Sequence, residues 1–276
     1  MAERADSSAR PAESEPLRLR RLLEPGRPAT VAEILEGMGT RDVGAAGRPH
    51  LILNMVSTAD GRATLGGRSG PISNRADREL FHGLRASVDA VMVGAGTVRA
   101  ERYGRLIRER QSRRLRRERG LCGEPLACIV SGSLSLPADL PLLREPEARV
   151  VIVTSSQASL AGNAAKLDYV RAAREGQLDL PAAMRELSER LRVRTLLCEG
   201  GPHLNAQLLA AGLVDELFLS LSPKLAGGDP ATGEGLRILA GEELDPPLEL
   251  ELVWVLEQDS HLFLRYRVKG ARDPAA

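Results

Sequence analysis

The sequence predicts an α/β protein with a mainly parallel central sheet, flanked by helices and completed by antiparallel C-terminal strands. Short apolar strands alternate with helical stretches between residues 51 and 211, which is typical of right-handed crossovers in a parallel sheet. After residue 214 only strand patterns remain, and the last two are joined by a tight turn near Gln258-Asp259. Such a turn favours antiparallel pairing.

The composition excludes some classes of function. The chain has 276 residues, a net charge of +1 and a hydrophobic fraction of 43%, which fit one compact domain and argue against a general nucleic-acid or membrane binder. No apolar run is long enough to cross a bilayer. The three cysteines and the histidines lack metal-ligand spacing. We therefore expect no metal, and reduced thiols in a cytoplasmic protein.

The chain divides into an N-terminal extension and one predicted domain. Residues 1–47 are expected to be a disordered or short helical extension: residues 1–16 lack the apolar core of a secretory signal. Within it, Thr30 and Glu33 have the spacing of a capping box, and Gly37 and Gly39 would stop that helix. Residues 48–270 form the domain, because no linker composition interrupts them.

The elements follow one another along this domain. Apolar runs bounded by turn residues predict the strands, and helical spacing of apolar residues predicts the helices. In chain order they are strand 51–56, helix 74–86, strand 88–93, a short helix from 96, strands 126–131, 149–154 and 167–171, helix 181–191, strand 194–198, helix 202–211, and strands 214–221, 248–256 and 260–268.

The most informative junction lies at residues 196–202. An apolar strand stops at Glu199, two glycines follow, and Pro202 opens a helix, a position that suits proline. Gly200 and Gly201 let a ligand approach the backbone, and the free N–H groups of a new helix attract anions. The junction is a candidate seat for a pyrophosphate, although a di-glycine alone is as often a plain tight turn.

Three further strand ends strengthen the cofactor hypothesis. Ligands in open α/β sheets sit beyond the carboxyl ends of the strands. Small and hydroxylated residues gather at such ends here, as phosphate and ribose contacts need. Turn chemistry explains each patch singly, but the four together favour a dinucleotide. The candidate cofactor-binding residues are Gly94, Gly96, Thr97, Ser131, Thr154, Ser155, Gly200 and Gly201.

Several motifs in order resemble the reductase domain of bacterial riboflavin biosynthesis, the RibD C-terminal domain family. The family's Asp-Gly-Arg turn, Leu-Arg-Ala and Gly-Ala-Gly-Thr-Val correspond to residues 60–62, 84–86 and 94–98. Its Glu-Gly-Gly, Gly-Leu-Val-Asp-Glu-Leu and Pro-Lys-Leu-x-Gly-Gly motifs correspond to residues 199–201, 212–217 and 223–228. The resemblance covers roughly residues 48–270.

The resemblance implies a dihydrofolate-reductase-like fold, NADPH as cofactor and a homodimer. It also implies reduction of 5-amino-6-(5-phosphoribosylamino)uracil, a phosphorylated pyrimidine. Hydride would pass to C1′ of the ribosylamino group, opened to its imine, to give a ribitylamino product. A cation near residues 131–133 or 154–156 would select the 2′-phosphate of NADPH, but the sequence leaves this cation open.

Two carboxylates are candidates for catalysis. Glu199 would be repelled by a pyrophosphate, so we expect its side chain to point into the substrate cleft, where it could accept N–H bonds and assist proton delivery. The resemblance also implies that it lines the substrate site; a salt-bridged glutamate at a strand end is the alternative. Asp60 lies in a turn after the first strand, and turn formation is as good an explanation as catalysis.

The substrate candidates are Ser69, Arg85, Thr97 and Asp77. The resemblance implies that the first three hold the sugar phosphate, and arginine suits a phosphate through its planar fork of donors. Arg85 could equally pair with a nearby acid. Asp77 lies in the first turn of a predicted helix, where an acid meets the helix dipole; that reading competes with binding of a pterin-type ring.

The chain departs from the family at residues 100–103, which read Ala-Glu-Arg-Tyr where Ala-Asp-Asp-Pro is usual. Pro71 also stands where a tryptophan is common. Nine arginines follow between residues 102 and 119, and we expect a solvated helical insert there rather than a nucleic-acid site. Two alternatives to the riboflavin-type reductase remain: a reductase of a pterin or another heterocycle, and a non-catalytic nucleotide-binding paralogue.

Overall fold

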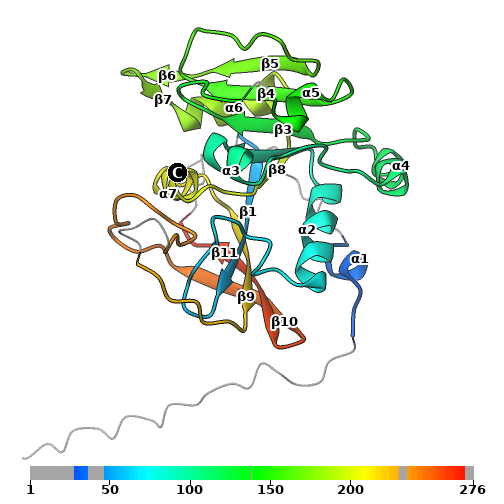
Figure 1. The fold of residues 1–276 in the computed structure, drawn as a ribbon, viewed down its shortest axis with the longest axis vertical. Helices are drawn as coiled ribbons and strands as arrows, with labels where there is room; N and C mark the ends of the chain where they lie inside the picture. The colour runs from blue at the N-terminus through cyan, green and yellow to red at the C-terminus, as the bar shows by residue number, and fades with distance from the viewer. Residues whose placement is uncertain (1–27, 37–46, 138, 230–234, 271–276) are drawn as a thin grey trace, which may run out of the picture.

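The computed structural model describes residues 28–36, 47–137, 139–229 and 235–270. Its centre is a nine-stranded sheet in the order β10-β11-β9-β1-β8-β2-β3-β4-β5 (Figure 1). All pairings from β9 to β5 are parallel, whereas β11 runs antiparallel to β9 and β10 antiparallel to β11. The predicted fold class is confirmed.

From β1 to β11 the predicted strands and helices appear in the predicted order, with ends that differ by at most two residues. The strands of the sheet are β1 His50–Thr58, β2 Ala90–Gly94, β3 Leu126–Val130, β4 Arg149–Thr154, β5 Lys166–Arg171, β8 Thr195–Cys198, β9 Glu216–Ser222, β10 Leu250–Gln258 and β11 His261–Val268. The helices are α1 Val31–Ile34, α2 Arg75–Ser87, α3 Ala95–Ala100, α4 Arg110–Glu118, α5 Pro141–Arg144, α6 Leu180–Glu189 and α7 Pro202–Ala210.

Helices cover both faces of the sheet because the parallel strands bury both of their faces. On one face, β1 contributes Leu51 and Leu53 to a core that also holds Met184 of α6 and Leu208 of α7. On the other face, Ile52 packs with residues of α2, β2 and β9. The alternation of side chains along a strand explains why neighbours enter opposite cores.

The local signals at both ends of the described chain were read correctly. Thr30 and Glu33 form a complete capping box at α1, whereas Gly37 and Gly39 and residues 1–27 lie outside the described residues. At the other end, β10 and β11 are joined by Asp259 and Ser260, which both have positive φ. That conformation matches the twist of a two-residue hairpin.

Two small features were not predicted. The helix α5 has four residues, and the hairpin of β6 Ala173–Arg174 and β7 Gln177–Leu178 pairs two residues on each side. Elements this short carry no readable periodicity. Within the part of the chain that the structure covers, no helix has both the length and the apolar character needed to cross a membrane.

Candidate active site

A cleft of about 1400 Å³ opens where β1, β2, β3 and β8 approach their carboxyl ends. One half is lined by the backbone after β2, β3 and β8. The other half is lined by α2, by the loop before it and by residues 100–109. The cleft therefore lies at the sheet edge where ligands of open α/β folds bind.

The glycine-rich half holds two helix starts side by side. The amide of Gly94 donates to the carbonyl of Gly200 at 2.8 Å. A Cβ built on Gly201 would come within 3.1 Å of the Thr97 hydroxyl, so a larger residue would crowd that side chain. The β2–α3 and β8–α7 junctions therefore touch, as the strand-end argument anticipated.

These two helix starts fit a pyrophosphate. Neither α3 nor α7 has a side-chain cap at its N-terminus, so the first-turn amides are left for another acceptor. A Cβ on Gly96 would meet no protein atom within 4 Å, because this glycine faces the open cleft. Anions bind to such uncapped helix starts through the amides and the helix dipole.

The hydroxyl candidates divide into two groups. Ser131 lines the cleft, whereas Thr154 and Ser155 are absent from its wall. The Thr154 side chain is fully buried, donates to the carbonyl of Gly132 at 3.2 Å and accepts from the amide of Ser156. This geometry gives Thr154 a structural task between two loops, and contact of Thr154 and Ser155 with a cofactor stays a prediction.

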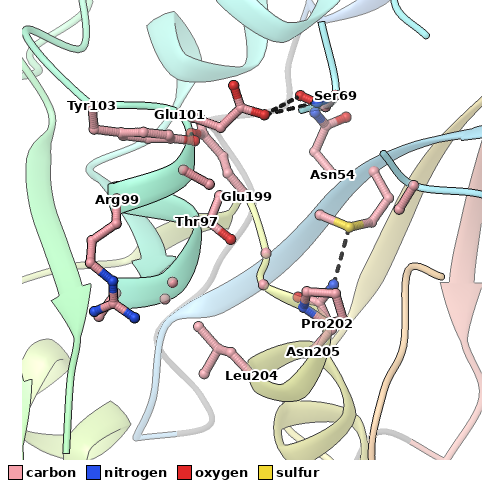
Figure 2. Close-up of a pocket in the computed structure, with 18 of the residues that line it drawn as sticks. Asn54, Ser69, Thr97, Arg99, Glu101, Tyr103, Glu199, Pro202, Leu204 and Asn205 are labelled. Atoms are coloured by element: carbon pink, nitrogen blue, oxygen red, sulfur yellow. Dashed lines mark hydrogen bonds between the residues drawn. The ribbon is translucent and has the colours of Figure 1, made fainter. Parts of the chain in front are cut away.

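Arg99 is a cation of the cleft wall, which Ser131 also lines, that the sequence did not single out. It comes from α3 and lines the cleft (Figure 2). Its side chain donates to the carbonyl of Ser135 at 2.7 Å. The side chain is exposed apart from this bond. Arg99 follows the Gly-Ala-Gly-Thr-Val motif directly, but nothing in the sequence showed that its side chain would turn toward the loop after β3.

Glu199, Arg85 and Tyr103 form a buried cluster in the wall of the cleft. Arg85 Nε and Nη2 donate to the two carboxylate oxygens of Glu199 at 2.6 and 2.7 Å. The Tyr103 hydroxyl donates to Glu199 Oε2 at 2.6 Å. The third Arg85 donor, Nη1, bonds the carbonyl of Leu106 at 3.2 Å. Both carboxylate oxygens of Glu199 therefore accept hydrogen bonds from the protein itself.

The pKa values of the cluster follow from this pairing. Burial is the largest single influence on Arg85 and would lower its pKa, but the charge and hydrogen bonds of Glu199, with a smaller contribution from Tyr103, together outweigh burial and raise that pKa above its usual value. Burial, together with the Glu199 charge, raises the pKa of the Tyr103 phenol well above its usual value. Arg85 is thus a fixed cation, and Tyr103 keeps its proton over the physiological range.

The structure brings together two residues that the sequence placed in separate roles. Arg85 was expected at a sugar phosphate and Glu199 at the reacting ring, whereas here each is the other's partner. Their predicted contacts with substrate stay predictions. The alternatives named for the two residues match the observed geometry: Arg85 pairs with an acid, and Glu199 is a salt-bridged glutamate at a strand end.

Ser69 and Thr97 line the same cleft. The Ser69 amide and hydroxyl both donate to one carboxylate oxygen of Glu101, at 2.8 and 3.0 Å (Figure 2). Glu101 belongs to the segment that departs from the family pattern. This departure therefore has a structural consequence, because the carboxylate holds the loop before α2 against α3.

Asp60 lies away from the cleft wall. One of its carboxylate oxygens accepts from the Thr58 hydroxyl, and the other accepts from the amides of Ala226 and Gly227. The Thr58 bond and then these two amides lower the pKa of Asp60 to about 2. A carboxylate that is ionised above that pH has no proton to donate near neutrality. The geometry fits a structural role of Asp60 in the turn and does not support a catalytic role.

Asp77 differs from the other acids of the cleft. The Asn74 side chain caps α2 by accepting from the amide of Asp77 at 2.8 Å, so the Asp77 carboxylate is not needed as the cap. Its side chain lines the cleft, and the residue is only 9% exposed. Within the described residues, no hydrogen bond or ion pair reaches this carboxylate. The sequence favours an interaction of this carboxylate with the helix start, and the Asn74 cap takes that place instead.

Two arginines on the rim of this half have no acidic partner among the described residues. Arg78 extends from α2 and Arg108 from the segment before α4, and both side chains are exposed and line the cleft. Arg108 belongs to the arginine-rich run, whereas Arg78 carries no sequence signal beyond its charge. The helical insert itself is confirmed as α4.

Comparisons with known proteins agree with the geometry. Residues 49–262 match the family model described as RibD C-terminal domain. A 2,5-diamino-6-ribosylamino-4(3H)-pyrimidinone 5′-phosphate reductase of Methanothermobacter thermautotrophicus is 30% identical over 229 residues, which cover 81% of this chain and all of that protein. The riboflavin biosynthesis protein RibD of Actinobacillus pleuropneumoniae is 28% identical, over 74% of this chain and 53% of that protein.

The fold is shared with solved structures. A pyrimidine reductase-like protein of Corynebacterium diphtheriae superimposes with a TM-score of 0.70 at 23% identity, over 89% of this chain and all of that one. The Saccharomyces cerevisiae riboflavin biosynthesis reductase Rib7 gives a TM-score of 0.61 at 18% identity, over 86% of this chain and 99% of that one.

Proposed function

The chain belongs to the RibD C-terminal domain family, and we propose that it reduces a ribosylaminopyrimidine 5′-phosphate with a nicotinamide cofactor. The observation that carries the proposal is the division of one cleft into two different halves. Uncapped helix starts and glycines line the first half. The second half is lined by the Asp77 carboxylate and by Arg78 and Arg108, which have no acidic partner among the described residues. A dinucleotide and a phosphorylated heterocycle fit these halves respectively.

The cofactor in this proposal is NADPH. Its pyrophosphate would lie at the start of α7, against Gly200 and Gly201, with Gly96 leaving room on the opposite side. Arg99 is the cation proposed for the 2′-phosphate, with Ser131 as a hydroxyl partner, because an arginine fork matches a phosphate. When bound, the reduced nicotinamide supplies the hydride for the reaction.

The protein's own contribution is to position the two reactants. The substrate accepts hydride at C1′ of its open imine, and the imine nitrogen takes one proton to become the amine. Glu199 is proposed to act at this site by holding Arg85 and Tyr103 in the cleft wall. Since both of its oxygens already accept hydrogen bonds, we assign the proton to water rather than to Glu199 or Asp60.

We assign the substrate phosphate to the rim of the second half. The three bonded nitrogens of Arg85 face Glu199 and Leu106, so binding a phosphate there would mean breaking a buried ion pair. Arg78 and Arg108 offer exposed guanidinium groups at the same cleft. Contacts of this kind add affinity without disturbing the Arg85–Glu199 pair.

A homodimer in the cytoplasm completes the proposal. The edge strand β10 exposes Leu250 and Leu252 at 40% and 37%, and an uncovered edge strand favours pairing with a second copy. Cys128 and Cys198 are free, buried thiols, which suit a reducing compartment.

The experiment follows NADPH absorbance in the presence of phosphoribosylaminopyrimidine substrates, with dihydrofolate assayed in parallel. Oxidation with a ribosylaminopyrimidine phosphate, and none with dihydrofolate, is the expected result. Oxidation with dihydrofolate alone would replace the proposal by a pterin reductase. NADPH binding without turnover of any of them would leave a nucleotide-binding protein without this activity.

A further inference from the structure

Four carboxylates line the cleft, and Asp77 differs from the other three. Glu199 is bonded to Arg85 and Tyr103, and Glu101 accepts from Ser69. Glu109 accepts from the Ser112 hydroxyl at 3.2 Å. Asp77 also lines the cleft, and only 9% of its surface is exposed. No described residue donates a hydrogen bond to its carboxylate.

The Asp77 carboxylate lies in the wall of the open cleft, where water can solvate its oxygens. A ligand that displaces this water must offer hydrogen-bond donors in its place, because a charged oxygen that loses its water without compensation costs free energy. The amide of Asp77 is already bonded to Asn74, so α2 is capped without the carboxylate. The two oxygens of Asp77 are therefore available to a molecule in the cleft.

The surroundings of Asp77 fit a flat heterocycle. Asn54 of β1 and Phe81, one turn further along α2, line the same cleft. The guanidinium of Arg85 covers the Phe81 ring at 4.1 Å from its centroid. An aromatic side chain with a few amide and carboxylate groups in one cleft is the usual equipment of a site that orients a polar ring.

The two candidate pyrimidine substrates differ at the ring edge that lies farthest from the ribosylamino group. The 2,5-diamino-4(3H)-pyrimidinone presents two adjacent donors there, the 2-amino group and N3–H. The corresponding uracil presents N3–H between two carbonyl oxygens. A carboxylate has only acceptors, so it can take both donors of the diaminopyrimidinone, whereas with the uracil one carbonyl would face a carboxylate oxygen.

We infer that Asp77 determines ring specificity by pairing both of its oxygens with the 2-amino and N3–H groups of a 2-aminopyrimidin-4-one. The inference rests on the proposed reductase function and deepens it. Asp77 thereby favours the aminated ring over its deaminated counterpart.

The test compares kcat/KM for the two substrates, 2,5-diamino-6-ribosylamino-4(3H)-pyrimidinone 5′-phosphate and 5-amino-6-(5-phosphoribosylamino)uracil, in wild type and Asp77→Asn. Asparagine keeps the shape but offers one acceptor and one donor, which complement N3–H and a neighbouring carbonyl of the uracil. We expect wild type to prefer the diaminopyrimidinone by roughly 10- to 100-fold, the range for a bidentate contact, and D77N to lose or reverse this preference.

Glu79→Gln is the matched control, because Glu79 is an exposed carboxylate of α2 that pairs with Arg75 and lies outside the cleft wall. Its substrate ratio should equal that of wild type, and the thermal midpoint of D77N checks that the variant is folded. A wild-type preference for the uracil, or an unchanged ratio in D77N, would overturn the role of Asp77 and leave the reductase function intact. Failure of wild type to reduce either substrate would instead remove the proposed function.

Discussion

Arg85 and Glu199 bind each other through two parallel hydrogen bonds of 2.6 and 2.7 Å, with 8% and 7% of their surfaces exposed. One residue comes from α2 and the other follows β8, so the pair joins the two halves of the cleft across 114 residues of sequence. A planar guanidinium fork matches a carboxylate in this bidentate arrangement. This ion pair therefore holds α2 against the end of β8, between the proposed cofactor and substrate positions, without any bound ligand.

Replacing Glu199 by glutamine should destabilise the protein. The change leaves the buried Arg85 without its carboxylate, and removing one partner of a buried pair costs about 3–5 kcal/mol. Urea denaturation measures the loss. Tyr103→Phe is the control, because it removes a single hydrogen bond to Glu199 and should cost only about 1.5–3 kcal/mol. We also expect E199Q to lose turnover and to keep its affinity for NADPH; full stability of E199Q would refute the pairing.

Arg99→Ala tests the cofactor assignment. If Arg99 holds the 2′-phosphate, KM for NADPH should rise by roughly tenfold or more, the weight of one charge-assisted contact. KM for NADH should stay unchanged because NADH lacks that phosphate. Equal effects on both cofactors would mean that Arg99 acts only through its bond to the Ser135 carbonyl.

Asp60→Asn separates catalysis from loop structure. A general acid contributes about 10²- to 10⁴-fold to the rate, so a loss of that size in kcat would return Asp60 to the catalytic list. We expect kcat to remain close to that of wild type, because Asp60 holds the amides of Ala226 and Gly227 outside the cleft wall. Increased proteolysis near residues 223–229 is the expected structural effect.

The buried pair of Glu216 and Arg265 predicts a pH dependence of stability. Burial by itself would raise the pKa of Glu216, but hydrogen bonds from His50 and Arg265 outweigh burial and bring that pKa to about 2. The pKa of the folded state thus lies below the usual 4.5. The unfolded chain therefore binds the proton first, so the contribution is complete above about pH 5 and is lost as pH falls toward 2.

The contribution of Glu216 is on the order of 3 kcal/mol, since one pKa unit corresponds to about 1.4 kcal/mol. Urea denaturation at a series of pH values measures it as a decline in unfolding free energy below pH 5. Glu216→Gln should flatten this part of the profile. An unchanged profile in E216Q would show that other carboxylates govern the acid transition.

The order of elements and the location of the cleft were predictable because they depend on local patterns. Alternating apolar runs and helical spacing determine the sheet, and the glycine junctions at Gly94 and Gly200 lie where parallel strands end. The partners of charged side chains were not predictable in the same way. Arg85 and Glu199 are far apart in sequence, and only the packing of α2 beside β8 brings them together.

The same limit applies to Asp77 and Asp60. Both lie in positions where turn or helix-start chemistry is a sufficient explanation, and sequence alone assigns such residues no partners. The structure distinguishes them, since two loop amides donate to the Asp60 carboxylate, whereas no donor from the described part of the chain reaches the carboxylate of Asp77. Burial together with missing hydrogen bonds is a signal that exists only in three dimensions.

The most direct test of the proposed reduction is to follow the hydride itself. The protein is incubated with NADPH deuterated at the transferable position and with a ribosylaminopyrimidine 5′-phosphate, and the product is analysed by mass spectrometry and NMR. The account predicts a ribitylamino product with one deuterium at C1′. Unchanged substrate, or a product that carries the deuterium on the ring, would contradict it.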